Sequence, residues 1–109
     1  MNKTQLKSIY QKVQKTRNEP NDNRYAKIHV LFHELALLKI EPETQNEKKK
    51  ENWPGAVGRS LEAAKKTKQF WKDFFEINSL KDLSNERLHE IEDFLEKKVQ
   101  YEYDRKFSV

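Results

Sequence analysis

The chain has 109 residues, a length typical of one domain, of which 35% are apolar and 37% are charged, with a formal net charge of +4. The absence of cysteine excludes disulfides and thiolate metal sites. Residues 1–20 contain no apolar run of the signal-peptide type, and no segment has the ~20 apolar residues of a membrane span, so we expect a cytoplasmic protein with no membrane partner.

Two helices are predicted in the N-terminal part of the chain. Within residues 3–17, apolar side chains recur at the spacing of one helix face, at Leu6, Ile9, Tyr10 and Val13. Residues 23–40 include IHVLFHELALLKI, which is apolar over most of a helix circumference. Such a helix is usually the one against which the others pack, so we expect it to form the centre of the fold.

A charged connector and a third helix follow. Glu41 is expected to end the second helix, because a residue before proline is pushed out of the helical region. Residues of about 41–53 begin with EPETQNEKKKEN, which has no apolar periodicity, and are predicted to form an exposed connector. A third helix is expected within residues 54–77, with an apolar side and a mainly charged side.

The stretch SLKDLS predicts a corner between the third helix and a fourth. We expect Asn78 and Ser79 to end the third helix. Ser84 is a good N-cap for the fourth, and Leu83 and Leu88 have the spacing of a hydrophobic staple, which fixes the entry angle of the chain.

These segments predict a single all-α domain over residues 1–109, a small bundle of three to four helices packed around residues 25–40. Alternation typical of strands is almost absent. The aromatic residues favour a packed core over disorder. The C-terminal tail, YEYDRKFSV, is predicted to fray over about residues 104–109.

Patterns that carry catalysis or metal binding are weak in this sequence. His29 and His33 are four residues apart, but no third ligand has a suitable spacing, and we interpret both as polar edges of a buried helix. There is no glycine-rich phosphate loop, no nucleophile signature and no carboxylate pair in an apolar setting. We therefore expect a non-enzyme with no catalytic residue, no cofactor and no bound metal.

Lysine rows are the leading candidates for a binding site. Lys65, Lys68 and Lys72 recur at three and four residues, so one helix side carries positive charge that can follow phosphates, with Lys66 beside it. Lys3 and Lys7 form a similar pair in the first helix. These rows favour DNA or RNA as the partner, and ordinary solvation of a lysine-rich surface is the alternative.

The chain also resembles a group of small phage proteins. In these an IHxxxxEL helix precedes an S-x-K-D-L-(S/T)-x-x-x-L corner and a last helix, as in Mu-phage GemA-like regulators and the helical tails of phage recombination and replication proteins. The matching positions here are Ile28, His29, Glu34, Leu35, Ser79, Lys81, Asp82, Leu83, Ser84 and Leu88. The resemblance implies a role in DNA transactions, through binding of nucleic acid or of a nucleoprotein complex.

The main hypothesis is therefore a phage- or mobile-element-type accessory protein that binds nucleic acid or a nucleoprotein complex through its Lys/Arg helix faces. The alternative is a protein-interaction module, an inhibitor or adaptor, that docks an aromatic helix face on a host protein. Exposed apolar patches usually mark partner surfaces. The candidate residues for such docking are Trp71, Phe74, Phe75, Tyr101 and Tyr103.

Overall fold

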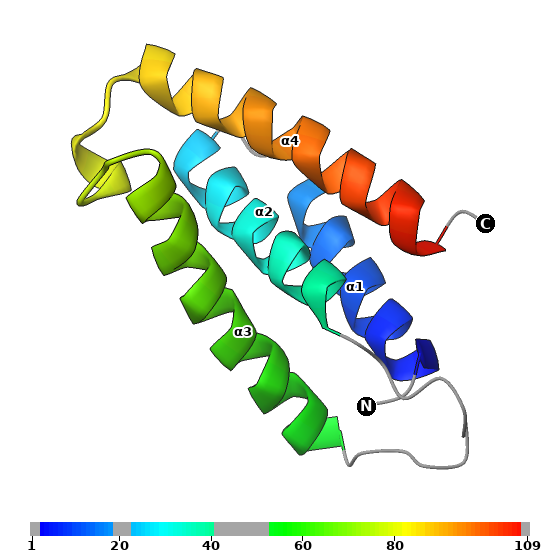
Figure 1. Cartoon of the computed structure of the whole chain (residues 1–109). Helices are drawn as coiled ribbons and strands as arrows, with labels where there is room; N and C mark the ends of the chain where they lie inside the picture. The colour runs from blue at the N-terminus through cyan, green and yellow to red at the C-terminus, as the bar shows by residue number, and fades with distance from the viewer. Residues whose placement is uncertain (1–2, 19–22, 41–52, 108–109) are drawn as a thin grey trace.

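The computed structural model describes residues 3–18, 23–40 and 53–107, and it confirms the predicted all-α bundle (Figure 1). Its α-helices and short 3-10 helix are α1 (Lys3–Asn18), α2 (Arg24–Lys39), α3 (Trp53–Phe74), η1 (Leu80–Asp82) and α4 (Asn85–Phe107). Within these ranges, no helix combines the length and the apolar composition needed to cross a membrane. The segment predicted as a connector lies outside the described residues, apart from residue 53, which begins α3.

Helix α2 is the centre of the bundle, as its apolar circumference predicted. It packs against each of the other three α-helices, and it lies between α1 and α3 in Figure 1. Six large apolar side chains of α2 are buried: Ile28, Leu31, Phe32, Leu35, Leu37 and Leu38. The hydrophobic effect of this burial supplies the main stabilisation of a domain with so few apolar residues.

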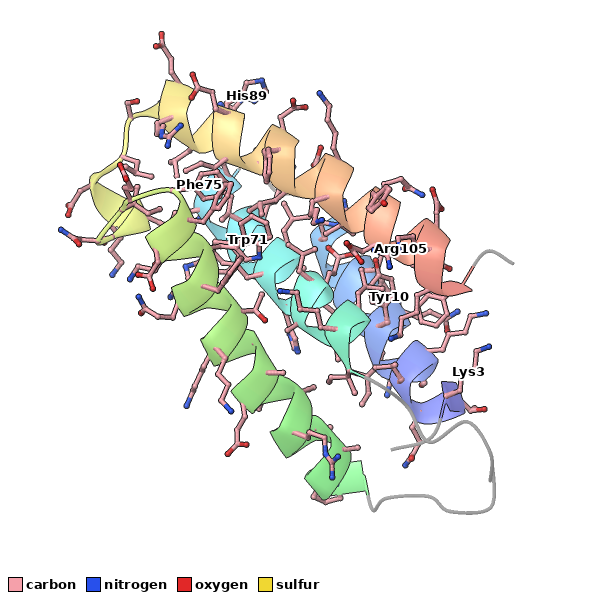
Figure 2. The ribbon with its side chains drawn as sticks, viewed as in Figure 1. Lys3, Tyr10, Trp71, Phe75, His89 and Arg105 are labelled. Atoms are coloured by element: carbon pink, nitrogen blue, oxygen red, sulfur yellow. The ribbon has the colours of Figure 1, made fainter. Side chains whose placement is uncertain are left out.

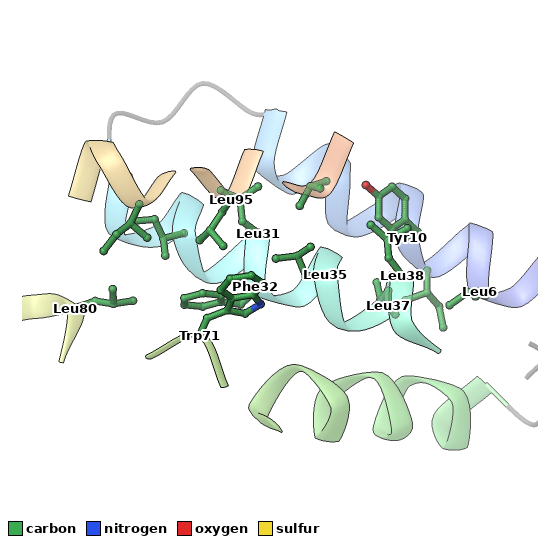
Figure 3. Packing of buried hydrophobic residues seen from close by; sticks show 14 of the residues in the cluster. Leu6, Tyr10, Leu31, Phe32, Leu35, Leu37, Leu38, Trp71, Leu80 and Leu95 are labelled. Carbon is green, nitrogen blue, oxygen red and sulfur yellow. The ribbon is translucent and has the colours of Figure 1, made fainter. Parts of the chain in front are cut away.

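Side chains from the surrounding helices complete the core (Figure 3). Leu6 and Tyr10 come from α1, Trp71 from α3, and Leu95 from α4. Figure 3 shows Trp71 of α3 beside Phe32 of α2. The core is therefore one contiguous cluster that joins all four α-helices.

The start of α4 follows the predicted cap. Ser84 Oγ accepts a hydrogen bond from the Arg87 backbone N–H at 3.2 Å, which satisfies one of the unpaired donors of the first turn. Leu88 is buried in the core, and the half-buried Leu83 packs against the same cluster. In η1, Ser79 Oγ accepts from the Lys81 backbone N–H at 3.3 Å, so the corner has a cap on each side.

The predicted end of α3 is wrong, because the helix stops at Phe74 and not at Asn78 and Ser79. Glu76 has a φ of 56°, a left-handed conformation that cannot continue a right-handed helix. Its N–H donates to the Asp73 carbonyl at 3.1 Å, and the Ile77 N–H donates to the Lys72 carbonyl at 2.9 Å. This pair of bonds is a Schellman motif with glutamate in the position that usually holds glycine.

The prediction that the tail frays is also wrong for residues 104–107, because these residues continue α4 to Phe107. The aromatic rings of this segment pack on α1, with the Tyr103 centroid 5.3 Å and the Phe107 centroid 6.2 Å from that of Tyr10. Lys106 Nζ also donates to the Ile40 carbonyl at 2.8 Å, beyond the end of α2. Tertiary contacts therefore hold the last turn of α4 in place.

Candidate functional site

Helix α3 presents two chemically different flanks. Its buried line, which faces the core, consists of Ala56, Ser60, Thr67 and Trp71. Because an α-helix turns about 100° per residue, side chains on either side of this line point to opposite flanks. One flank carries the predicted lysines, and the other carries the exposed Phe70 and Phe74, of which Phe74 stacks on Phe94 of α4.

The lysine row, which we define as Lys65, Lys68 and Lys72, is accessible to solvent along one flank of α3. Lys65 and the neighbouring Lys66 are exposed, and the other two are half-exposed. In the part of the chain that the structure describes, none of these lysines forms an ion pair. Acidic residues of α4 pair with other cations instead: Glu90 with Arg87 and Asp93 with Lys97, each at 3.1 Å, and Glu92 with Arg24 of α2 at 3.5 Å.

A hollow of about 260 Å³ opens between α2 and α3 beside the lysine row. Its lining combines apolar and cationic groups: His29, Phe32, Leu61, Ala64, Lys65 and Lys68. Leu61 is 51% exposed at its rim, a high value for a leucine. We refer to this feature as the α2–α3 hollow.

His29 contributes a neutral, polar group to the α2–α3 hollow. Burial lowers its pKa below the ordinary 6.5, and the positive charges of Lys68 and Lys72 lower it further. Its Nε2 atom is buried without a hydrogen-bond partner among the described residues. Burial likewise lowers the pKa of His33. Across residues 3–18, 23–40 and 53–107, no three metal-ligating side chains come together around these histidines.

Lys3 and Lys7, the other predicted lysines, do not join the lysine row. Both are exposed on α1, which lies across α2 from α3 (Figure 1). Lys7 Nζ lies 6.0 Å from the ring centroid of Phe107, at the C-terminal end of α4. Figure 2 places Lys3 at the start of α1, away from Trp71 and Phe75. The six predicted lysines therefore belong to two separate surfaces.

An aromatic face, which we define as Phe70, Phe74 and Phe94, covers the opposite flank of α3 and the adjoining part of α4. The three side chains are 52%, 56% and 42% exposed. Phe74 and Phe94 stack with centroids 5.9 Å apart and an interplanar angle of 27°. Trp71, only 5% exposed, supports them from below, with its centroid 5.1 Å from Phe74 and 5.8 Å from Phe94.

Cations lie over the rings of this region. Lys39 Nζ is 4.8 Å from the Phe70 centroid, and the Arg87 guanidinium carbon is 5.7 Å from the Phe75 centroid. Cation–π attraction at such exposed positions contributes about 0.5–1 kcal/mol. Lys39 therefore places a positive charge at the edge of the aromatic face, whereas Arg87, beside it, is already paired with Glu90.

The five residues predicted for partner binding separate into distinct environments. Phe74 belongs to the aromatic face, whereas Trp71 and Phe75 pack inward beneath it (Figure 2). Tyr101 is 57% exposed farther along α4, with Lys98 and Arg105 over its ring. Tyr103 packs against the core beside α1.

Sequence reasoning did not single out Phe70 and Phe94. Phe70 could have been predicted from the sequence, because it lies four residues before the candidate Phe74 and residues four apart share a helix flank. Phe94 stands among acidic residues of α4 and reaches the aromatic face only through the packing of two helices. Its ring centroid lies 5.6 Å from that of Phe75.

A buried polar cluster joins α1 to α2 and was also missed. Glu34 is fully buried, its Oε2 lies 2.7 Å from Arg17 Nε, and the Tyr10 hydroxyl donates to its Oε1 at 3.1 Å. Burial raises the pKa of Glu34, and the Arg17 charge opposes that rise. Burial and the Glu34 charge raise the pKa of Tyr10. Since the carboxylate is closed to solvent, we interpret the cluster as a structural link.

Comparisons with known proteins give no match for this chain, whether to models of protein families, to curated proteins or to solved structures. The resemblance to small phage proteins therefore stays an expectation from the sequence.

Proposed function

We propose that this chain is a small accessory protein that binds nucleic acid, or a nucleoprotein complex, through the lysine row of α3. The supporting observation is that Lys65, Lys68 and Lys72 share an accessible flank and form no ion pair among the described residues. Lysines that already neutralise carboxylates lose part of their attraction for phosphate. A free row at this spacing instead releases counterions from a nucleic-acid backbone when it binds.

The arrangement of α3 adds to this proposal. The buried line from Ala56 to Trp71 fixes the helix against α2, so the lysine row is held on a rigid element. Charges on a rigid helix lose less conformational freedom on binding than charges on a mobile loop. The similarity to GemA-like regulators of DNA transactions points to the same class of partner.

The proposal is tested by charge reversal with a matched control. The triple variant Lys65→Glu, Lys68→Glu and Lys72→Glu should bind both duplex and single-stranded DNA at least about tenfold more weakly at low salt, because phosphate contacts are independent of sequence. Fluorescence anisotropy with labelled oligonucleotides measures this change.

The control reverses Lys3, Lys7 and Lys15 on α1, which changes the net charge by the same amount on a different surface. We expect this variant to retain most of the affinity. Equal losses in both triple variants would show that binding follows net charge and not the lysine row. No binding by the wild-type protein at low salt would contradict the proposal altogether.

Protein docking through the aromatic face is the second candidate, favoured by the exposure of Phe70, Phe74 and Phe94. Exposed aromatic rings with cations at their edge match the composition of protein interfaces. A partner that uses this face should be retained by the wild-type protein and lost by the double variant Phe74→Ser, Phe94→Ser. The Leu61→Ser variant, which changes an exposed apolar residue on the other flank, should retain it.

A further inference from the structure

The α2–α3 hollow has the chemistry of a site for one flat, weakly polar ring attached to an anion. Phe32, Leu61 and Ala64 supply apolar walls, and Lys65 and Lys68 supply positive charge at the rim. The half-buried imidazole of His29 completes the lining.

The size of the hollow limits the ligand. Pockets for drug-sized molecules have volumes of roughly 300–1,000 Å³, and the 260 Å³ of this hollow lies just below that range. It therefore has room for a single ring system and not for an extended ligand. The chain that carries the ring has to continue outside, along the lysines.

We propose that the α2–α3 hollow accepts an unpaired base of a single-stranded nucleic acid whose phosphates contact Lys65 and Lys68. This inference rests on the proposed function and specifies its substrate class. The bases of a duplex are stacked and paired, so they cannot enter a concave site without being extruded. A single strand presents bases that are free to insert, and apolar walls hold them without selecting one base strongly.

The lysine spacing fits this arrangement. Lys65 and Lys68 are three residues apart on one helix flank, so both reach the same side of the hollow. A strand that lies along α3 keeps its phosphates on the lysine row while one base turns inward. The exposed Leu61 then becomes part of the contact with that base, which explains an otherwise unfavourable exposure of its side chain.

The test fills the hollow and leaves the lysines unchanged. In the Ala64→Leu variant the added side chain occupies the hollow, and affinity for a short oligothymidine should fall roughly tenfold because the inserted base loses its contacts there. Affinity for a duplex of the same length should stay within twofold or so of the wild type. Ala63→Leu is the matched control, since Ala63 does not line the hollow, and it should leave both affinities unchanged.

A second variant guards against misfolding of the first. Leu61→Ser changes an exposed rim residue and should also weaken binding of the single strand selectively, with an unchanged melting temperature. If both variants bind the single strand as well as the wild type does, or lose single strand and duplex equally, the base-insertion inference is wrong while the lysine row stands. If the wild-type protein binds neither oligonucleotide at low salt, the proposed function fails as well.

Discussion

The Glu34 carboxylate is fully enclosed, and its environment decides how α1 is held on α2. An ionised carboxylate without a partner is strongly disfavoured in a protein interior. Here the Arg17 guanidinium and the Tyr10 hydroxyl approach its two oxygens from α1. These two contacts therefore help to fix the orientation of α1 on α2.

Removal of the Arg17 charge should destabilise the fold. Arg17→Met leaves Glu34 buried without its cation, and we expect the free energy of unfolding to fall by about 3 kcal/mol. The double variant Arg17→Met, Glu34→Met should recover most of that loss, because two apolar side chains replace the pair. Urea unfolding measures both changes, and a single variant as stable as the wild type would contradict this role.

Glu76 is a second residue that affects stability, because its left-handed backbone conformation at the end of α3 is unfavourable for a residue with a side chain. Glu76→Gly should raise the free energy of unfolding by about 0.5–1 kcal/mol, because glycine adopts this conformation without a steric penalty. Glu76→Ala keeps the penalty and should change stability little. Thermal unfolding of the two variants checks this, and equal melting temperatures would show that the φ angle carries no strain.

At the scale of the helices, the sequence was a good guide to where each helix lies and a poor guide to two of the helix ends. Apolar periodicity identifies the four helices because one face of each is buried. The end of α3 was not predictable, because glutamate is rarely the left-handed residue of a helix terminus. The end of α4 was not predictable either, because Tyr103 and Phe107 are ordered by packing on α1.

The two histidines of α2 give this helix a pH-dependent contribution to stability. The pKa values of His29 and His33 are lowered in the folded state, below the ordinary 6.5. As the pH falls through 6.5, the unfolded state takes up protons before the folded state does. The contribution of the two histidines to stability is therefore fully present above pH 6.5. It is lost as the pH falls toward their lowered pKa values in the folded state.

Replacement of both histidines should remove this dependence. We expect the wild-type free energy of unfolding to fall between about pH 7.5 and about pH 5.5, and the double variant His29→Gln, His33→Gln to show a smaller fall. The exposed His89 provides the control variant His89→Gln, which should keep the wild-type dependence. Identical pH profiles for the double variant and the wild type would contradict the assignment to α2.

For the whole molecule, the candidate surfaces depend on packing that no local pattern contains. The spacing of Lys65, Lys68 and Lys72 predicted a shared flank, but only the fold shows that Lys3 and Lys7 lie on another surface. The same holds for the aromatic face, where Phe94 joins Phe74 across two helices. The two flanks of α3 are separate, so the two proposed binding surfaces, the lysine row and the aromatic face, share no side chain.

The salt dependence of DNA binding tests the lysine row most directly. We expect Lys65, Lys68 and Lys72 each to contact one phosphate of a duplex. A plot of the logarithm of the binding constant against the logarithm of the salt concentration should then have a slope of about −2.7 or steeper. The triple Lys→Glu variant should show a slope flatter by about that amount. A wild-type slope near zero, or the same slope in both proteins, would contradict binding through the lysine row.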